Sequence, residues 1–373
     1  MLLLLCVIAA LLWCIVLLLP WQPWRIRESL AAKSTASTIT PSITALLPAR
    51  NEAAQIGRVL TALADQPEVA RILLIDDQSD DGTGAVAASL GIAKLTVLSG
   101  TTPPPCWSGK LWALQQGLEQ VTTDRVLLLD ADIELRPGTV AALCDKSDHD
   151  RRDLVSLMAR LHMAGFWEKL LLPPFVYFFK LLYPFALANR TESKLAAAAG
   201  GCILVRTKCL HRIGGFGALC DALIDDCTLA RLVKQDGGRI WIGLSHDAIA
   251  VRPYGDLAGI WNMVARTAYT QLRYSPALLL SCTMLMLTLF VAPVFGLFAL
   301  HANTVISAVL ALTAMLASFT PTILYYRLHP GWILGLPVAA CLYLAMCWTS
   351  AMRYWRGERS RWKGRSYRRA DAT

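Results

Sequence analysis

The stretch RVLLLDADIEL, residues 125–135, ends a run of apolar residues in two aspartates that a single alanine separates. An uninterrupted apolar run of this length is typical of a strand buried on both faces of a sheet. Paired carboxylates after such a strand form either a solvated turn or a site for a cation. The surrounding sequence has to decide between these two interpretations.

Short apolar runs alternate with segments of helical spacing on the amino-terminal side of this stretch. This alternation predicts an α/β domain with a mostly parallel sheet that helices cover on both faces. In such sheets, ligands bind at the carboxyl ends of the strands. The runs expected to form strands are ITALLP (43–48), RILLID (71–76), KLTVLSG (94–100) and RVLLLD (125–130).

Polar residues follow three of these expected strands. The segments are PARNE (48–52), DDQSDDGT (76–83) and DAD (130–132). Asp130 and Asp132 are two positions apart, so a turn of the backbone can bring both carboxylates to one divalent cation. Mg²⁺ and Mn²⁺ prefer carboxylate oxygens and bridge them to phosphate oxygens.

The second polar segment contains four aspartates with different expected roles. Asp80 or Asp81 is expected to cap the helix that follows, because aspartate favours turns and helix starts. Asp76 and Asp77 lie deeper, at the end of the strand. There a carboxylate can accept hydrogen bonds from a base or from a ribose hydroxyl.

Hydrophobic residues make up 55% of the 373-residue chain and charged residues 17%, which is more apolar than a soluble globular protein. Four uncharged runs are long enough to cross a bilayer, and burial inside a soluble protein is the alternative. The first run lacks a basic start and a small-residue cleavage site, so we interpret it as a retained anchor and not as a cleaved signal peptide. The runs are 2–19, 277–300, 305–324 and 333–351.

The net charge of +9 is concentrated in the tail after residue 353, where basic and aromatic residues are interleaved. Beside a membrane helix, this composition favours the anionic cytoplasmic leaflet, with nucleic-acid binding as the alternative. Basic residues follow the first and the last apolar run, and this places both of these flanking segments in the cytoplasm. Three full spans between them would put the tail outside, so either one run is re-entrant or residues 177–188 enter the membrane. The sequence leaves the topology open.

The chain has 11 cysteines and no C-x-x-C pair, which favours reduced thiols. Zinc sites usually use closely spaced pairs, so a zinc site is the weaker interpretation of the four evenly spaced cysteines. These are Cys202, Cys209, Cys220 and Cys227.

The motifs taken together resemble the family 2 glycosyltransferases, whose nucleotide-sugar-binding fold is known as GT-A. The resemblance covers residues 42–241, and the amino-terminal anchor, the carboxyl-terminal apolar runs and the segments SHDAIAVRPY and RTAYTQLRYSP are most similar to the bacterial hopene-associated glycosyltransferases. The matching segments, in order, are LLPARNE, IDDQSDDGT, GKLWALQQG, LLLDADIEL, AAGGCILVRTKCLHRIGGF and LIDDCTLARLVKQDGGRIW.

The resemblance implies a nucleotide pocket formed by Pro48, Arg50, Glu52 and Asp77, with Asp77 on the base and Glu52 on the ribose. Lys110 would lie near the phosphates, with a solvated lysine in the first helical turn as the alternative.

The same resemblance implies that Asp132 is the direct metal ligand of a D-x-D motif and that Asp130 lies nearer the sugar. Asp226 would be the general base, and Asp225 stands where the family usually has glutamate. Gly201, in the glycine-rich segment, would border the substrate. A cation stabilises the leaving diphosphate, and a base takes the proton of the acceptor hydroxyl.

The acceptor side is expected in the apolar, aromatic segment 165–189, where Pro173 and Pro174 should break a helix into two pieces. We expect a helix pair in the membrane interface beside the active site, and a buried core helix is the alternative. The segment QLRYS (271–275) departs from the Q-x-x-R-W signature of processive enzymes, which favours the transfer of one sugar. His246 either contacts substrate or is an ordinary residue at a strand edge.

The sequence therefore predicts a membrane-bound, inverting transferase of the bacterial inner membrane, with its catalytic domain in the cytoplasm. It would use Mg²⁺ or Mn²⁺, a nucleotide sugar (UDP by default) and a lipid acceptor such as a hopanoid. An inactive scaffold and a synthase of polyprenyl-phosphate sugars are the alternatives, the latter through Arg190, Lys194, Arg206 and Lys208. The expected parts are an anchor (1–20), a linker (21–41), the GT-A domain (42–275), membrane helices (276–352) and a basic tail (353–373).

Overall fold

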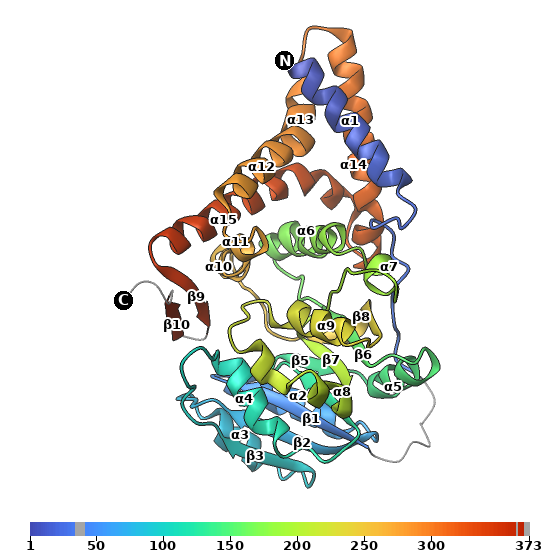
Figure 1. Ribbon diagram of the computed structural model, residues 1–373. Helices are drawn as coiled ribbons and strands as arrows, with labels where there is room; N and C mark the ends of the chain where they lie inside the picture. Colours follow the sequence, from blue (N-terminus) through green and yellow to red (C-terminus); the bar gives the residue numbers. More distant parts are fainter. Residues whose placement is uncertain (34–41, 363–364, 369–373) are drawn as a thin grey trace. The chain divides into compact units, whose positions relative to one another are not determined.

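The computed structural model describes residues 1–33, 42–362 and 365–368. The chain divides into a sheet unit, residues 28–162 and 187–253, and a helical unit, residues 1–27, 163–186 and 254–373 (Figure 1). Residues 34–41 of the expected linker and 369–373 of the expected tail lie outside the described residues.

The sheet unit is built on an eight-stranded sheet with the order β3-β2-β1-β4-β7-β6-β8-β5. The pairs β3/β2, β2/β1, β1/β4 and β6/β8 are parallel, whereas β7 is antiparallel to β4 and β6, and β5 is antiparallel to β8. The sheet is therefore mixed, and the predicted parallel part is its β3–β4 half. The strands are β1 (Ile43–Ala49), β2 (Val69–Asp76), β3 (Leu95–Ser99), β4 (Arg125–Leu129), β5 (Ile133–Leu135), β6 (Leu154–Arg160), β7 (Cys202–Arg206) and β8 (Ile240–Ala250).

Helices cover both faces of this sheet, as predicted. Side chains alternate between the faces along each strand, so on β1 Ala45 and Leu47 pack on one face and Leu46 on the other. The first face carries α2 (Ala53–Ala64), α3 (Thr83–Ser89) and α5 (Thr139–His149). The second carries α4 (Gly109–Leu118), α8 (Thr207–Arg212), the 3₁₀ turn η1 (Gly215–Leu219) and α9 (Asp225–Gln235).

Part of the expected linker is docked on the sheet unit. Ser29 forms an isolated parallel bridge with Leu244 of β8, and the Ala32 N–H donates to the Asp247 carboxylate at 2.8 Å. Residues 28–33 therefore lie along β8.

The helical unit contains three helices that are long and apolar enough to cross a membrane: Pro276–Gly296, Ala302–Tyr325 and Pro330–Trp355. Helix α1 has 17 residues, which gives a length of about 26 Å at 1.5 Å per residue, slightly less than the hydrocarbon core of a bilayer. The elements are α1 (Leu2–Leu18), α6 (Phe166–Leu182), α10 (Leu257–Ala265), α11 (Ala268–Gln271), α12 (Pro276–Met286), the π-helical turn η2 (Leu287–Val291), α13 (Ala292–Gly296), α14 (Ala302–Tyr325), η3 (Pro330–Gly335), α15 (Leu336–Trp355), β9 (Glu358–Trp362) and β10 (Arg365–Arg368).

Helix α1 packs lengthwise along α14 (Figure 1). Small residues form the seam, with Ala9 and Ala10 of α1 against Ala311 of α14. The Trp13 indole N–H donates to the Leu289 carbonyl oxygen at 3.1 Å, inside the π-helical turn. Small side chains and one interhelical hydrogen bond are the usual means of helix association in an apolar environment.

The prediction that Pro173 and Pro174 break the apolar segment was wrong, because both lie inside the continuous helix α6. Both prolines are buried, so packing in the helical unit offsets the backbone hydrogen bonds that they remove. The helix ends instead at Leu182, and its cap residue Tyr183 precedes Pro184, whose ring disfavours helical conformation at Tyr183. The short helix α7 (Phe185–Ala188) follows.

Candidate active site

The polar segments after β1, β2 and β4 lie at one edge of the sheet, as predicted. These strands are neighbours in space and run parallel, with Ala49 of β1 opposite Asp76 of β2 and Leu46 of β1 opposite Leu128 of β4. Their carboxyl ends therefore place Arg50, Asp77 and Asp130 along a common edge.

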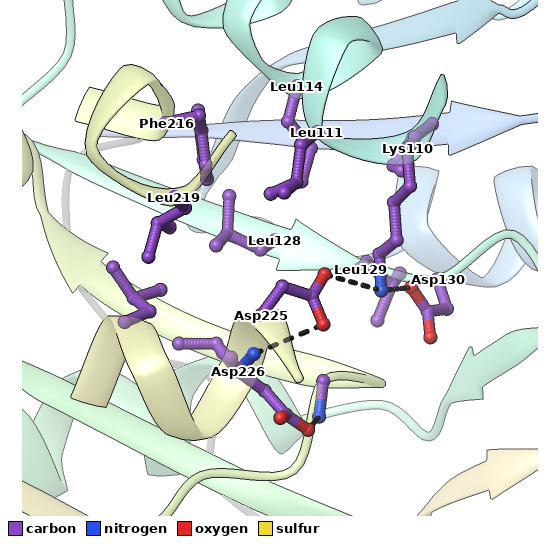
Figure 2. Close-up of a pocket in the computed structure, with 14 residues that line it drawn as sticks. Lys110, Leu111, Leu114, Leu128, Leu129, Asp130, Phe216, Leu219, Asp225 and Asp226 are labelled. Atoms are coloured by element: carbon purple, nitrogen blue, oxygen red, sulfur yellow. Dashed lines mark hydrogen bonds and ion pairs between the residues drawn. The ribbon is translucent and has the colours of Figure 1, made fainter. Parts of the chain in front are cut away.

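Lys110 forms ion pairs with a carboxylate at the end of β4 and with one at the start of α9. Its Nζ lies 2.7 Å from Asp130 Oδ1 and 3.8 Å from Asp225 Oδ2 (Figure 2). The Ser108 side chain caps α4 by accepting the Leu111 N–H, which fixes Lys110 in the first helical turn. Burial disfavours the ammonium, but attraction to Asp130 and Asp225 outweighs it and raises the pKa of Lys110. The alternative of a freely solvated lysine is thereby excluded.

The main chain holds Asp226, the residue after Asp225. Its Oδ2 accepts the Gly200 N–H at 2.8 Å, and its Oδ1 accepts the Cys227 N–H at 2.7 Å. Burial, followed by repulsion from the Asp225 carboxylate, raises the pKa of Asp226 to about 6. A carboxylate with this pKa is ionised at neutral pH and is a stronger base than an ordinary aspartate.

Glycine at position 200 keeps the space beside Asp226 open. A Cβ atom at this position would lie 3.3 Å from Asp226 Oδ2 and 3.5 Å from Lys110 Nζ. Gly201 has a main-chain role, because its carbonyl oxygen accepts the Asp130 N–H at 3.1 Å. The glycine-rich segment therefore positions both the D-x-D motif and Asp226.

A single pocket brings together five of the predicted site residues. Figure 2 shows the Lys110 side chain between the carboxylates of Asp130 and Asp225, with Asp226 next to Asp225. The lining residues predicted from the sequence are Pro48, Lys110, Asp130, Asp225 and Asp226.

Arg50 and Asp77 lie next to each other at the ends of β1 and β2. The Arg50 guanidinium donates to the main-chain oxygens of Asp77 at 2.6 Å and Gln78 at 3.0 Å, and the Asp77 side chain is buried. Arg50 thus holds the loop that carries Asp77.

The capping role expected for Asp80 or Asp81 belongs to Asp81. Its carboxylate accepts the N–H groups of Ala53 and Thr83, the first residues of α2 and α3, at 2.9 and 3.0 Å. Asp80 is exposed.

The remaining members of the predicted site, Glu52 and Asp132, share one arginine that the sequence analysis did not assign a role. Arg252 forms an ion pair with Glu52, and its Nε lies 3.3 Å from Asp132 Oδ2. The Val251 N–H donates to the Asp132 main-chain oxygen at 2.9 Å, next to the ladder in which Ile133 of β5 faces Ala250 of β8. The sequence shows this arginine directly after the segment that forms β8. It does not show the β5/β8 pairing that brings the arginine to the D-x-D motif.

The donor set of the D-x-D motif fits a hard divalent cation that shares its coordination with a ligand. Asp130 and Asp132 each carry a basic partner, Lys110 and Arg252 respectively, so both carboxylates face positive charge. Within the part of the chain that the structure describes, no three His, Cys, Asp or Glu side chains gather as a complete metal site. Mg²⁺-like cations are commonly held by one or two carboxylates with phosphate oxygens and water supplying the rest.

His246 lies partly buried on β8. Gln271 of the QLRYS segment accepts a hydrogen bond from the Tyr183 hydroxyl at 2.7 Å, within the helical unit.

Comparison with known proteins shows what part of the chain is similar to. Residues 44–214 match the family model described as Glycosyl transferase family 2. The chain is 33% identical over 121 residues to 4,4'-diaponeurosporenoate glycosyltransferase of Staphylococcus aureus (strain USA300), covering 32% of each protein. The protein of the same name from Staphylococcus haemolyticus (strain JCSC1435) is 31% identical over 103 residues, which cover 28% of this chain and 27% of the relative. The matched part spans about a third of the length of these relatives.

A solved structure of low sequence identity has a similar fold. Mannosyltransferase PcManGT from Pyrobaculum calidifontis, solved in complex with GDP-Man and Mn²⁺, superposes with a TM-score of 0.56 at 19% identity, covering 96% of this chain and all of that one. The chain therefore has the GT-A fold, which confirms the fold that the sequence resemblance implied.

Proposed function

We propose that the protein is a membrane-bound, inverting glycosyltransferase that moves one sugar from a nucleotide-sugar donor to a lipid acceptor. The observation that carries this proposal is the pocket at the strand ends of a GT-A sheet, where the main-chain-held Asp226 faces the Lys110–Asp130 ion pair. A base and a cation that line one pocket suit the attack of a hydroxyl on a sugar–diphosphate bond.

Asp226 takes the proton of the acceptor hydroxyl as that oxygen attacks the anomeric carbon. The N–H groups of Gly200 and Cys227 fix the direction of its carboxylate. With one carboxylate acting as base on the face opposite the leaving group, the anomeric configuration inverts. Asp225 supports this group by pairing with Lys110.

The donor is held by the strand-end residues. Asp77 contacts the base, Glu52 contacts the ribose, and Pro48 and Arg50 shape the pocket around the nucleotide. Lys110 turns its ammonium toward the diphosphate, the part of the donor that gains negative charge. A UDP-sugar is the default donor, and the presence of GDP-Man in PcManGT makes a GDP-sugar the second choice.

Mg²⁺ or Mn²⁺ would be held by Asp132 and Asp130. When bound there, the cation stabilises negative charge on the departing nucleoside diphosphate. Support comes from the two carboxylates, each of which has a basic side chain beside it, and from the Mn²⁺ in the PcManGT complex.

A lipid acceptor, of the hopanoid or another polyisoprenoid class, is supported by the three apolar helices and by the relatives named for 4,4'-diaponeurosporenoate. We place the protein in the bacterial inner membrane, with its sheet unit in the cytoplasm and α6 in the membrane interface. A polyprenyl-phosphate acceptor would require basic residues around the pocket. Arg206 instead faces Arg125 at the opposite end of β4, where it pairs with Asp148 at 3.3 Å.

The test uses the full-length protein in detergent with Mn²⁺, a panel of UDP- and GDP-sugars and a bacterial lipid extract. We expect lipid-dependent release of nucleoside diphosphate from one donor, lost in Asp132→Ala and Asp226→Ala. Asp124→Asn is the matched control, because Asp124 is exposed at the other end of β4. Release that persists in both alanine variants would overturn the residue assignments, and no release from any donor would overturn the activity.

A further inference from the structure

We propose that Arg252 is the counter-ion of Asp132 in the metal-free site and becomes a ligand of the donor diphosphate once the metal is bound. This inference rests on the proposed function and extends it. It assigns a binding role to a residue outside the motifs to which the sequence analysis gave site roles.

Charge balance at the strand ends is the first argument. The two chain cations Lys110 and Arg252 face more carboxylates than they can neutralise, so the cluster is negative. These carboxylates are Glu52, Asp130, Asp132, Asp225 and Asp226. A divalent cation together with a diphosphate adds little net charge, so the cluster can hold the two ligands together.

The second argument is that each carboxylate of the D-x-D motif has its own basic partner from a different element. Lys110 of α4 pairs with Asp130, and Arg252, directly after β8, lies against Asp132. Both cations occupy positions at carboxylate oxygens that a metal ion needs. A metal ion therefore competes with them for these oxygens. Arg252 keeps Glu52 as a partner when the metal takes Asp132, and its Nε donor can then turn to the donor diphosphate.

The third argument is that Arg252 is not needed to hold the strands together. The β5/β8 ladder and the Val251–Asp132 main-chain hydrogen bond already fix this part of the backbone. The Arg252 Nε atom is buried, and within the described part of the chain it makes no hydrogen bond although Asp132 lies 3.3 Å away. The guanidinium thus keeps a donor available for a better-placed acceptor, and its planar fork matches phosphate geometry.

An order of binding follows from this exchange. A divalent cation alone competes with Arg252 for Asp132 and binds weakly. A nucleoside diphosphate offers Arg252 a new partner, so each ligand strengthens the binding of the other, and the coupling is reciprocal.

The test measures binding without turnover, on the full-length protein in detergent. Free Mn²⁺ is followed by electron paramagnetic resonance, first without nucleotide and then with the nucleoside diphosphate that the donor panel identifies. In Arg252→Gln we expect Mn²⁺ alone to bind about threefold to tenfold more tightly, and the nucleoside diphosphate with Mn²⁺ to bind about tenfold more weakly. Changes in opposite directions are the signature of the exchange.

Two further variants keep the test decisive. Arg58→Gln removes an arginine that pairs with Glu134 of β5 and not with Asp132, and we expect it to change neither affinity. Arg252→Lys keeps the charge without the fork, so we expect weak Mn²⁺ binding as in the wild type and a partial loss of diphosphate affinity.

Affinities that fall together in Arg252→Gln, or that do not change, would overturn the role of Arg252 while leaving an active wild type intact. If the wild type itself binds no nucleoside diphosphate with Mn²⁺, both this inference and the proposed function fail.

Discussion

The two units of the chain bury charge in different ways. In the helical unit, Glu168 and Lys180 are each only 2% exposed and are held by main-chain groups. Glu168 accepts the N–H groups of Ala164, Gly165 and Tyr254, and Lys180 donates to the Arg25 carbonyl oxygen. In the sheet unit, the two carboxylates of the D-x-D motif pair with side chains and remain partly exposed, with 34% for Asp130 and 29% for Asp132.

This difference separates structural charge from exchangeable charge. A main-chain partner cannot move away without unfolding a segment, so Glu168 and Lys180 stabilise the fold permanently. A lysine or arginine side chain can change partners at the cost of a rotamer, so a ligand can replace it. Asp226 has features of both kinds of charge. Main-chain N–H groups hold its carboxylate, whereas the neighbouring Lys110–Asp225 ion pair joins two side chains that can change partners.

The largest expected effect is on catalysis. Asp226→Asn keeps an oxygen for only one of the Gly200 and Cys227 N–H groups and cannot take a proton, so we expect turnover to fall by about 10³. The measurement is the initial rate of lipid-dependent nucleoside diphosphate release, beside Asp124→Asn. A loss smaller than tenfold would show that Asp226 is not the base.

The opposite pattern is expected for Glu168→Ala, which leaves three N–H groups without their acceptor. We expect the free energy of unfolding to fall by about 3 kcal/mol, because buried donors without partners are costly. Thermal unfolding in detergent measures this, with the exposed Glu192→Ala as control. An unchanged unfolding temperature would contradict the distinction between the two kinds of buried charge.

The smallest effect is a pH dependence that reports on Asp226. Below its pKa of about 6 the carboxyl group is protonated and cannot act as a base, so kcat/KM should fall about tenfold per pH unit there and level off above it. The profile of initial rates between pH 5 and about 8 measures this. An acid limb near the ordinary aspartate pKa would contradict the burial argument.

Much of the sheet unit was predictable because its signals are local. Apolar runs located β1, β2, β3 and β4, and the parallel order placed their polar ends at one edge, where Asp77 and Asp130 lie. The roles of Asp130, Asp132 and Asp226 came from the family resemblance and remain predictions, although the structure brings Asp130 and Asp226 to one pocket.

What escaped prediction depends on pairing between distant segments. The antiparallel strands β7 and β5 enter the sheet through contacts with β4 and β8, and no local pattern encodes these contacts. Arg252 was overlooked for the same reason. The prediction of a break at the two prolines of α6 was wrong because it used a local rule, whereas burial in the helical unit keeps the helix continuous.

The hydrogen bond from Trp13 to Leu289 joins residues 276 positions apart, and this has a consequence for biosynthesis. Helix α1 leaves the ribosome before the sheet unit, and its partners α13 and α14 leave after the sheet unit. The intervening sheet unit can complete its fold during that interval, since domains fold as units while synthesis proceeds. We therefore expect the helical unit to assemble only after α14 has been synthesised, when the seam of small residues on α1 can be covered.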